Sequence, residues 1–270
     1  MGVTGRVAAS GFAKPLDLER HLRGARDGGK KLLVPYVMGG MSPDWLDVVR
    51  AIAAAGADAI EVGIPFSDPM IDGPVIQAAG SIALERGTTP EGVLAELARV
   101  DVDVPVVVMT YYNLVFRAGT RRFASHLARS GVSGAILADL PLEEGTGWCE
   151  EADAAGVATV LLVSPATPDD RARRICERAR GFVYGVATMG VTGSDLAASA
   201  TAAATRLKKL TDRPVCIGIG VSTPAQAGDV CSHADGAIVG SALVRRLLDG
   251  AGPEGAAEFV GELRAGIDAI

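Results

Sequence analysis

Residues Leu32–Val62 read LLVPYVMGGMSPDWLDVVRAIAAAGADAIEV and contain one complete strand–helix–strand unit. The two ends of this stretch, Leu32–Met38 and Asp58–Val62, are short apolar runs of the kind that forms buried strands. Between them, Trp45–Ile52 has the apolar spacing of a helix face, and Gly56 marks the end of that helix. The stretch therefore predicts two parallel strands connected by a helix.

The same unit is repeated along the chain. Strands that are apolar on both faces and separated by helices are typical of a parallel sheet covered by helices. Eight such runs in 270 residues fit the roughly 250 residues of a (β/α)8 barrel, the TIM barrel. We therefore expect an α/β protein in which residues 1–270 form a single (β/α)8 barrel domain. The six further runs are Val104–Met109, Gly134–Ala138, Thr159–Val163, Phe182–Val186, Val215–Ile219 and Gly236–Val239.

An extra N-terminal helix is expected before the first strand, at about Leu16–Arg26, where the amphipathic pattern suits a plug over the bottom of the barrel. The structural alternative is an open doubly wound sheet, which is built from similar units. Its dinucleotide-binding fingerprint is incomplete, because Gly218-Ile-Gly220 is not followed by the third glycine.

Composition and charge exclude several classes of partner. The net charge is -6 and no basic stripe is present, which argues against a nucleic-acid partner. No apolar run approaches the roughly 18 residues of a membrane span, and the N-terminus lacks the apolar core of a signal peptide. The four cysteines form no CxxC pair, so we expect small buried side chains rather than disulfides or a zinc site. These features predict a cytoplasmic protein.

Three carboxylates are the candidate catalytic groups, because the active site of such a barrel lies at the carboxyl ends of its strands. Alternation along the second strand places either Ile60 or Glu61 inside the barrel, and an outward-facing Glu61 is the alternative. An inward Glu61 would have a raised pKa, which suits a general acid or base. The loop that follows carries Asp68 and Asp72, which are also ordinary turn or cap residues.

Three glycine-rich turns follow the last three strands, at Gly190–Gly193, Gly218–Gly220 and Gly240–Ser241. In barrels of this class the backbone N–H groups of such turns bind a phosphate. The expected phosphate-binding residues are Gly193, Gly220, Gly240 and Ser241.

Several polar residues near strand ends are expected to contact the substrate. For Asp139 and Tyr184 a helix cap or a buried hydroxyl with a satisfied hydrogen bond is an equal alternative. None of the five lysines lies at the carboxyl end of a strand, and the three histidines are poorly placed for a metal site. We therefore expect neither a Schiff base nor a metal ion. The expected substrate contacts are Tyr36, Tyr111, Asp139, Tyr184 and Thr192.

At these residues the sequence resembles the tryptophan synthase alpha subunit family. The matching stretches are Glu61–Pro74, Met109–Asn113, Ala138–Pro141, Gly190–Gly193 and Gly236–Ser241. The resemblance implies a lyase of tryptophan biosynthesis, which cleaves indole-3-glycerol phosphate to indole and glyceraldehyde 3-phosphate by a retro-aldol reaction. It further implies that Glu61 protonates C3 of the indole ring and that Asp72 faces the indole N–H.

The resemblance also implies a partner, the beta subunit, in an alpha2beta2 tetramer. Pyridoxal phosphate would belong to that partner, so no cofactor is expected in this chain. The loops Pro65–Gly73 and Ala187–Ser194 would close over the substrate. Two stretches differ from the family pattern: Tyr36–Pro43 lacks the more usual threonine with Gly-x-Pro, and Leu114 replaces a proline.

Three alternatives stay open at this point. The first is a stand-alone indole-3-glycerol-phosphate lyase of specialised metabolism. The second is a non-catalytic phosphate-binding subunit that regulates its partner. The third is another phosphosugar isomerase built on the same barrel.

Overall fold

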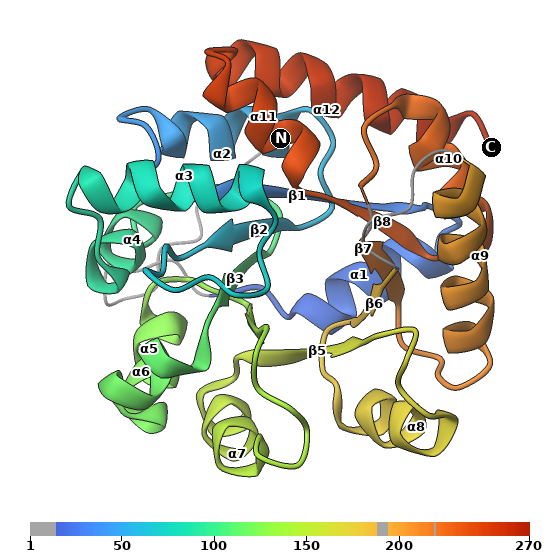
Figure 1. Cartoon of the computed structure of the whole chain (residues 1–270), viewed down its shortest axis with the longest axis horizontal. Helices are drawn as coiled ribbons and strands as arrows, with labels where there is room; N and C mark the ends of the chain where they lie inside the picture. Colours follow the sequence, from blue (N-terminus) through green and yellow to red (C-terminus); the bar gives the residue numbers. More distant parts are fainter. Residues whose placement is uncertain (1–14, 188–193, 219) are drawn as a thin grey trace, which may run out of the picture.

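A computed structural model of the chain describes residues 15–187, 194–218 and 220–270. Eight strands form a closed parallel barrel in sequence order, and β1 completes the ring by pairing with β8 (Figure 1). The predicted (β/α)8 barrel is confirmed, and the open doubly wound sheet is excluded. The strands are β1 (Leu32–Met38), β2 (Ile60–Gly63), β3 (Val106–Thr110), β4 (Gly134–Leu137), β5 (Ala158–Val163), β6 (Val183–Val186), β7 (Val215–Gly218) and β8 (Gly236–Val239).

Helices surround this ring and connect its strands (Figure 1). Within the described ranges no helix is both long and apolar enough to cross a bilayer. The helices are α1 (Leu18–Asp27), α2 (Trp45–Ala54), α3 (Pro74–Glu85), α4 (Pro90–Leu97), α5 (Tyr112–Ala118), α6 (Thr120–Arg129), α7 (Thr146–Ala155), α8 (Asp169–Arg178), α9 (Ser194–Lys208), α10 (Pro224–His233), α11 (Ser241–Leu248) and α12 (Gly252–Asp268).

The second strand begins at Ile60, two residues later than the sequence predicts. Asp58 is buried and serves as a junction instead: its Oδ2 accepts the backbone N–H of Leu33 at 2.8 Å. The same carboxylate pairs with Lys30 at 2.6 Å and with Arg264 of α12 at 3.2 Å. The residue therefore ties the start of β1 to the last helix at the amino-terminal end of the barrel.

The barrel interior at this end is closed by α1. Leu18 and Leu22 are fully buried and belong to the same apolar cluster as the inward side chains of the strands. Two glycines leave room for Leu18, because a Cβ at Gly134 would lie 2.8 Å from its Cδ2 and a Cβ at Gly181 would lie 2.5 Å from it. The predicted plug is therefore confirmed.

Replacing Leu18 by alanine should lower the free energy of unfolding by about 2–5 kcal/mol, because a buried leucine leaves a cavity that its neighbours fill only in part. Denaturant unfolding measures the effect. The matched control is Leu84→Ala on α3, where the side chain is 37% exposed. Equal losses in the two variants would show that the plug adds no more stability than a surface leucine.

Candidate active site

Glu61 points into the barrel. It pairs in register with Tyr36 of β1 and with Val107 of β3, and it is 1% exposed. Its neighbour Ile60 belongs to the other apolar core, between the strands and the helices. The outward alternative for Glu61 is therefore wrong. The inward position follows from the period-two alternation of β2.

The carboxyl group of Glu61 is held in a form that suits proton transfer. Its Oε2 is buried and has no hydrogen-bond partner among the described residues. Burial raises the pKa of Glu61 to about 8, and the charge of Asp72 adds to the shift. The side chain therefore carries a proton at neutral pH and loses it slightly above neutrality.

Two tyrosines lie beside Glu61 in the mouth of the barrel. A Cβ at Gly63 would lie 1.9 Å from the Tyr36 hydroxyl, and a Cβ at Gly218 would lie 2.4 Å from the Tyr184 hydroxyl. The two glycines at strand ends thus allow both rings to cross the barrel mouth. Burial, with a smaller contribution from Glu61, raises the pKa of each tyrosine well above its usual value. Both hydroxyls stay protonated and can donate hydrogen bonds.

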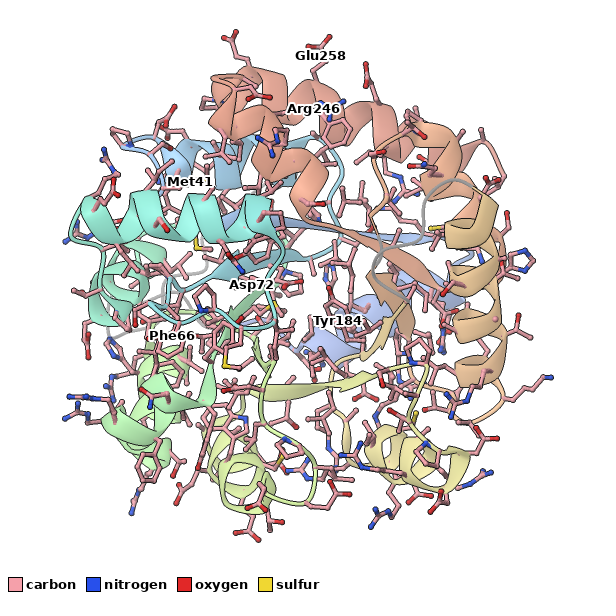
Figure 2. The ribbon with its side chains drawn as sticks, viewed as in Figure 1. Met41, Phe66, Asp72, Tyr184, Arg246 and Glu258 are labelled. Atoms are coloured by element: carbon pink, nitrogen blue, oxygen red, sulfur yellow. The ribbon has the colours of Figure 1, made fainter. Side chains whose placement is uncertain are left out.

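Asp72 lies in the loop between β2 and α3, and contacts from the next strand hold this loop in place. The ring of Phe66 stacks on Tyr111, with centroids 5.0 Å apart. The Tyr111 hydroxyl accepts the N–H of Ile71 at 3.1 Å, and Gln77 donates to the carbonyl of Asp72 at 2.8 Å. Figure 2 shows Asp72 and Tyr184 both within the ring of strands when the barrel is viewed end on.

Burial raises the pKa of Asp72, while a hydrogen bond from Tyr111 opposes the shift. Asp72 also lines an apolar pocket at this end of the barrel, whose other walls include Tyr36, Met38, Phe66, Met109 and Tyr111. A partly buried carboxylate on an apolar wall is suited to accept one N–H group from a flat aromatic ligand.

Tyr111→Phe should lower kcat/KM by up to about tenfold, because it removes a hydrogen bond worth roughly 0.5–1.5 kcal/mol from the loop of Asp72. The acid limb of the pH profile should also move to higher pH, since this hydrogen bond lowers the pKa of Asp72. Tyr112→Phe is the matched control, because that ring contacts only Phe116 among the aromatic residues described. Identical kinetics in the two variants would contradict a role in holding the loop.

The structure gives less support to a substrate contact by the remaining candidate residues. Asp139 is exposed, and its Oδ1 accepts the backbone N–H of Tyr112 at 2.7 Å, as expected for a cap at the start of α5. Asp68 is exposed and bonded to the hydroxyl of Ser67. Thr192 lies outside the described residues.

The predicted phosphate turns lie at neighbouring strand ends. Gly220 is exposed just after β7, and Gly240 precedes α11, whose first residue Ser241 is exposed. Since β7 pairs with β8, these turns belong to one side of the barrel mouth. The N-cap residue of α11, Gly240, has no side chain to cap the helix, so the first N–H groups of α11 are suited to bind an anion. Gly193 lies outside the described residues.

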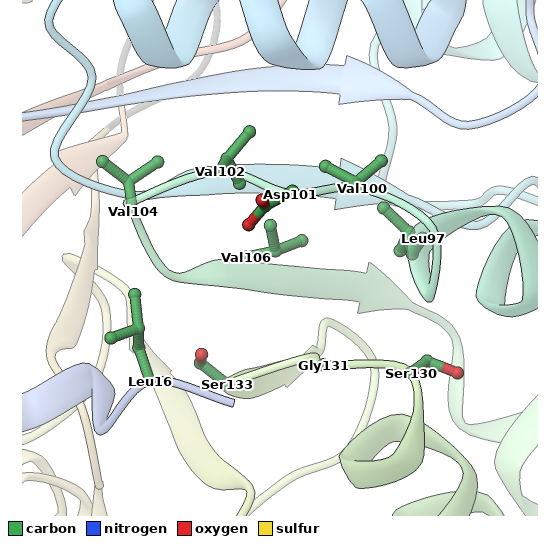
Figure 3. A pocket seen from close by; sticks show the side chains of 10 residues that line it. All are labelled: Leu16, Leu97, Val100, Asp101, Val102, Val104, Val106, Ser130, Gly131 and Ser133. Carbon is green, nitrogen blue, oxygen red and sulfur yellow. The ribbon is translucent and has the colours of Figure 1, made fainter. Parts of the chain in front are cut away.

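The methionines of the pocket were not among the residues predicted from the sequence. Met38 lies two residues after Tyr36 on β1 and Met109 lies two after Val107 on β3, so alternation could have placed both inside. A separate pocket at the amino-terminal end of β3 is lined by valines, two serines and the single acid Asp101 (Figure 3). It offers no pair of acids. In residues 15–187, 194–218 and 220–270, no group of three or more His, Cys, Asp or Glu side chains could hold a metal ion.

An inward-facing acid beside an apolar pocket, at the carboxyl end of a closed (β/α)8 barrel, defines a barrel enzyme that works by proton transfer. A family model described as tryptophan synthase alpha chain matches residues 22–263. The chain belongs to the tryptophan synthase alpha chain family.

Individual relatives agree with this assignment. The chain is 46% identical over 239 residues to the tryptophan synthase alpha chain of Halorhodospira halophila, covering 85% of this chain and 87% of that one. It is 42% identical to the Streptomyces coelicolor alpha chain, covering 91% and 94%. A solved tryptophan synthase alpha subunit from Legionella pneumophila superposes with a TM-score of 0.87 at 31% identity, covering 94% and 99%. A solved tryptophan synthase from M. tuberculosis gives 0.85 at 34% identity, covering 93% and 99%.

Members of this family are lyases of tryptophan biosynthesis that cleave indole-3-glycerol phosphate to indole and glyceraldehyde 3-phosphate. They carry no cofactor themselves; pyridoxal phosphate belongs to the beta subunit, with which they form an alpha2beta2 complex. The family, the enzyme class, the reaction and the partner that the sequence predicts are therefore confirmed at the level of the family.

Proposed function

We propose that this chain cleaves indole-3-glycerol phosphate with Glu61 as the general acid–base and Asp72 as the acceptor of the indole N–H. The observation that carries the proposal is the inward position of the buried Glu61, whose Oε2 has no hydrogen-bond partner among the described residues, beside a pocket that Asp72 lines. Such a carboxyl group is available to exchange a proton with a ligand.

The chemistry begins with the proton on Glu61. With a pKa of about 8, this side chain can protonate C3 of the indole ring at neutral pH. Protonation leaves positive charge on the ring, mainly at nitrogen, and an ionised Asp72 stabilises that charge through the N–H hydrogen bond. The ring then accepts the electron pair of the breaking carbon–carbon bond.

Cleavage also requires removal of a proton from the glycerol hydroxyl on the adjacent carbon. The Glu61 carboxylate formed in the first step can accept it, so one residue donates a proton and takes one back. The products are indole and glyceraldehyde 3-phosphate. Neither a lysine imine nor a metal ion is needed, because the protonated ring is the electron sink.

The remaining residues would bind and orient the substrate. We assign the phosphate to the backbone N–H groups of Gly193, Gly220, Gly240 and Ser241. Tyr36, Tyr111, Tyr184, Asp139 and Thr192 are assigned to the substrate or to the loops around it. The adjacency of β7 and β8 and the uncapped start of α11 support the phosphate assignment.

We further propose that residues 1–270 form one domain and that the protein is cytoplasmic. The first proposal is supported by the single closed ring formed by strands from Leu32 to Val239. The second is supported by the reaction, because a phosphorylated intermediate of amino-acid biosynthesis does not cross membranes unaided.

Indole release from indole-3-glycerol phosphate, measured with and without a beta subunit, tests the function. Activity that rises when the partner is added is the expected result. Full activity in its absence would favour the stand-alone lyase, and no activity in either case would favour the non-catalytic regulatory subunit. Turnover of another phosphosugar, with the indole substrate ignored, would favour the isomerase.

A further inference from the structure

Met38 forms part of the wall of the pocket that Asp72 lines. It is the last residue of β1, 3% exposed, and it faces the same side of the strand as Tyr36. Its sulfur lies 3.9 Å from the Tyr36 hydroxyl. It lines the pocket together with Asp72 and Met109. This part of the wall is therefore built from two thioether side chains.

The space beside Met38 is left open by a glycine on the facing helix. Gly80 is buried in the interior of α3, and a Cβ at this position would lie 3.5 Å from the Met38 methyl group. A glycine inside a helix costs roughly 0.5–1 kcal/mol relative to alanine. Because nothing in the geometry of α3 requires a glycine here, the open space is the feature that distinguishes this position.

The backbone that carries Met38 is fixed. The N–H of Gly39 donates to the carbonyl of Gly63 at 2.9 Å. Gly40 has a φ of 76°, and a Cβ there would lie 2.2 Å from the Thr88 hydroxyl. Any adaptation at this end of β1 must therefore come from the side chain of Met38. Methionine is suited to this, since it is unbranched and fills irregular gaps in several rotamers.

We propose that Met38, packed against Gly80, determines which ring-substituted indoles the site accepts, and that the chain cleaves indole-3-glycerol phosphates that carry a methyl-sized group on the benzo ring. The inference rests on the proposed function. Asp72 and Glu61 engage N1 and C3, so the benzo ring is the part of the substrate that faces the apolar wall. Rotation of Met38 toward Gly80 makes room for the added group.

The test compares kcat/KM for the 4-, 5-, 6- and 7-methyl derivatives with kcat/KM for unsubstituted indole-3-glycerol phosphate, all assayed in the alpha–beta complex. The wild-type chain should cleave at least one methyl isomer within about tenfold of the parent, because the space beside Gly80 has room for the added group. Without such room, a pocket discriminates against one extra methylene by about 10–200-fold. For that isomer, Met38→Ile and Gly80→Ala should each lower the ratio to the parent by about tenfold. Isoleucine is stiff at χ1, and the alanine methyl occupies the free space.

Met41→Leu is the matched control, because Met41 is buried in the same apolar cluster as Met38 but does not line the pocket. It should leave the ratio unchanged. Gly80→Ala should keep or raise the melting temperature, which separates a change in selectivity from a loss of folding.

The proposal is overturned if every methyl isomer is more than about tenfold poorer than the parent in the wild type. It is also overturned if Met38→Ile and Gly80→Ala give the same ratio of kcat/KM, methyl isomer to parent, as Met41→Leu. Failure of the wild-type complex to cleave the parent would instead refute the proposed function.

Discussion

Glu61→Gln is expected to lower the turnover of indole-3-glycerol phosphate by about 10²- to 10⁴-fold, the usual contribution of a positioned general acid–base. Glutamine keeps the shape of the side chain but has no proton to give to C3 of the indole ring. Single-turnover measurement of indole release gives the rate of the chemical step. A loss of less than about tenfold would contradict the assigned role.

The same variant should be more stable than the wild type at neutral and alkaline pH. An unfolded Glu61 ionises above about 4.5, whereas the folded protein keeps the proton until about pH 8. Between these values the folded state binds more protons than the unfolded state, so stability falls as pH rises. Glutamine does not titrate and escapes this loss, which amounts to about 1.4 kcal/mol for each unit of pKa shift. Denaturant unfolding at pH 5 and pH 8 measures the difference. An advantage that does not grow with pH would contradict the raised pKa.

Asp72→Asn should give the second-largest effect, a loss in kcat of about 10²-fold or more, because a charged hydrogen-bond partner of the developing cation is removed. The pKa of Glu61 should fall as well, since the charge of Asp72 contributes to raising it; burial, the larger cause, is unchanged. The alkaline limb of the pH profile, near pH 8 in the wild type, should therefore move to lower pH.

Asp68→Asn is the matched control for this experiment. It changes a carboxylate in the same loop that is exposed and bonded to Ser67. Assayed on the chain without a partner, it should leave both kcat and the pH profile unchanged. Equal losses at Asp68 and Asp72 would mean that the loop as a whole, rather than the one carboxylate, supports the reaction.

Much of the barrel could be predicted from the sequence because the pattern is local. The runs at Leu32–Met38 and Gly236–Val239 match β1 and β8 residue for residue. The start of β2 was misplaced by two residues, because Asp58 is buried by ion pairs with Lys30 and Arg264. Those partners lie in other parts of the chain, and no local pattern contains them.

The site was predictable in part. The sequence singled out Glu61 and Asp72, but it left the direction of Glu61 open between two registers. It offered a helix cap as one of two roles for Asp139, but it did not indicate that the capped helix is α5, or that Tyr111 contacts the loop of Asp72. Both contacts join segments that are separate in sequence. The pocket-lining role of Met38 was also missed, since a methionine carries no motif of its own.

By itself, the sequence determined the order of strands and helices, the helical plug, and the residues that could carry acid–base chemistry, because apolar periodicity and residue type are properties of the chain. The tertiary structure alone decided that Glu61 faces inward and that its pKa rises to about 8. It also decided that Met38 meets Gly80 across the pocket. The physical reason is that pKa values and pocket shape depend on which surfaces lose water together, and closing the barrel brings together groups from strands and loops far apart in the chain.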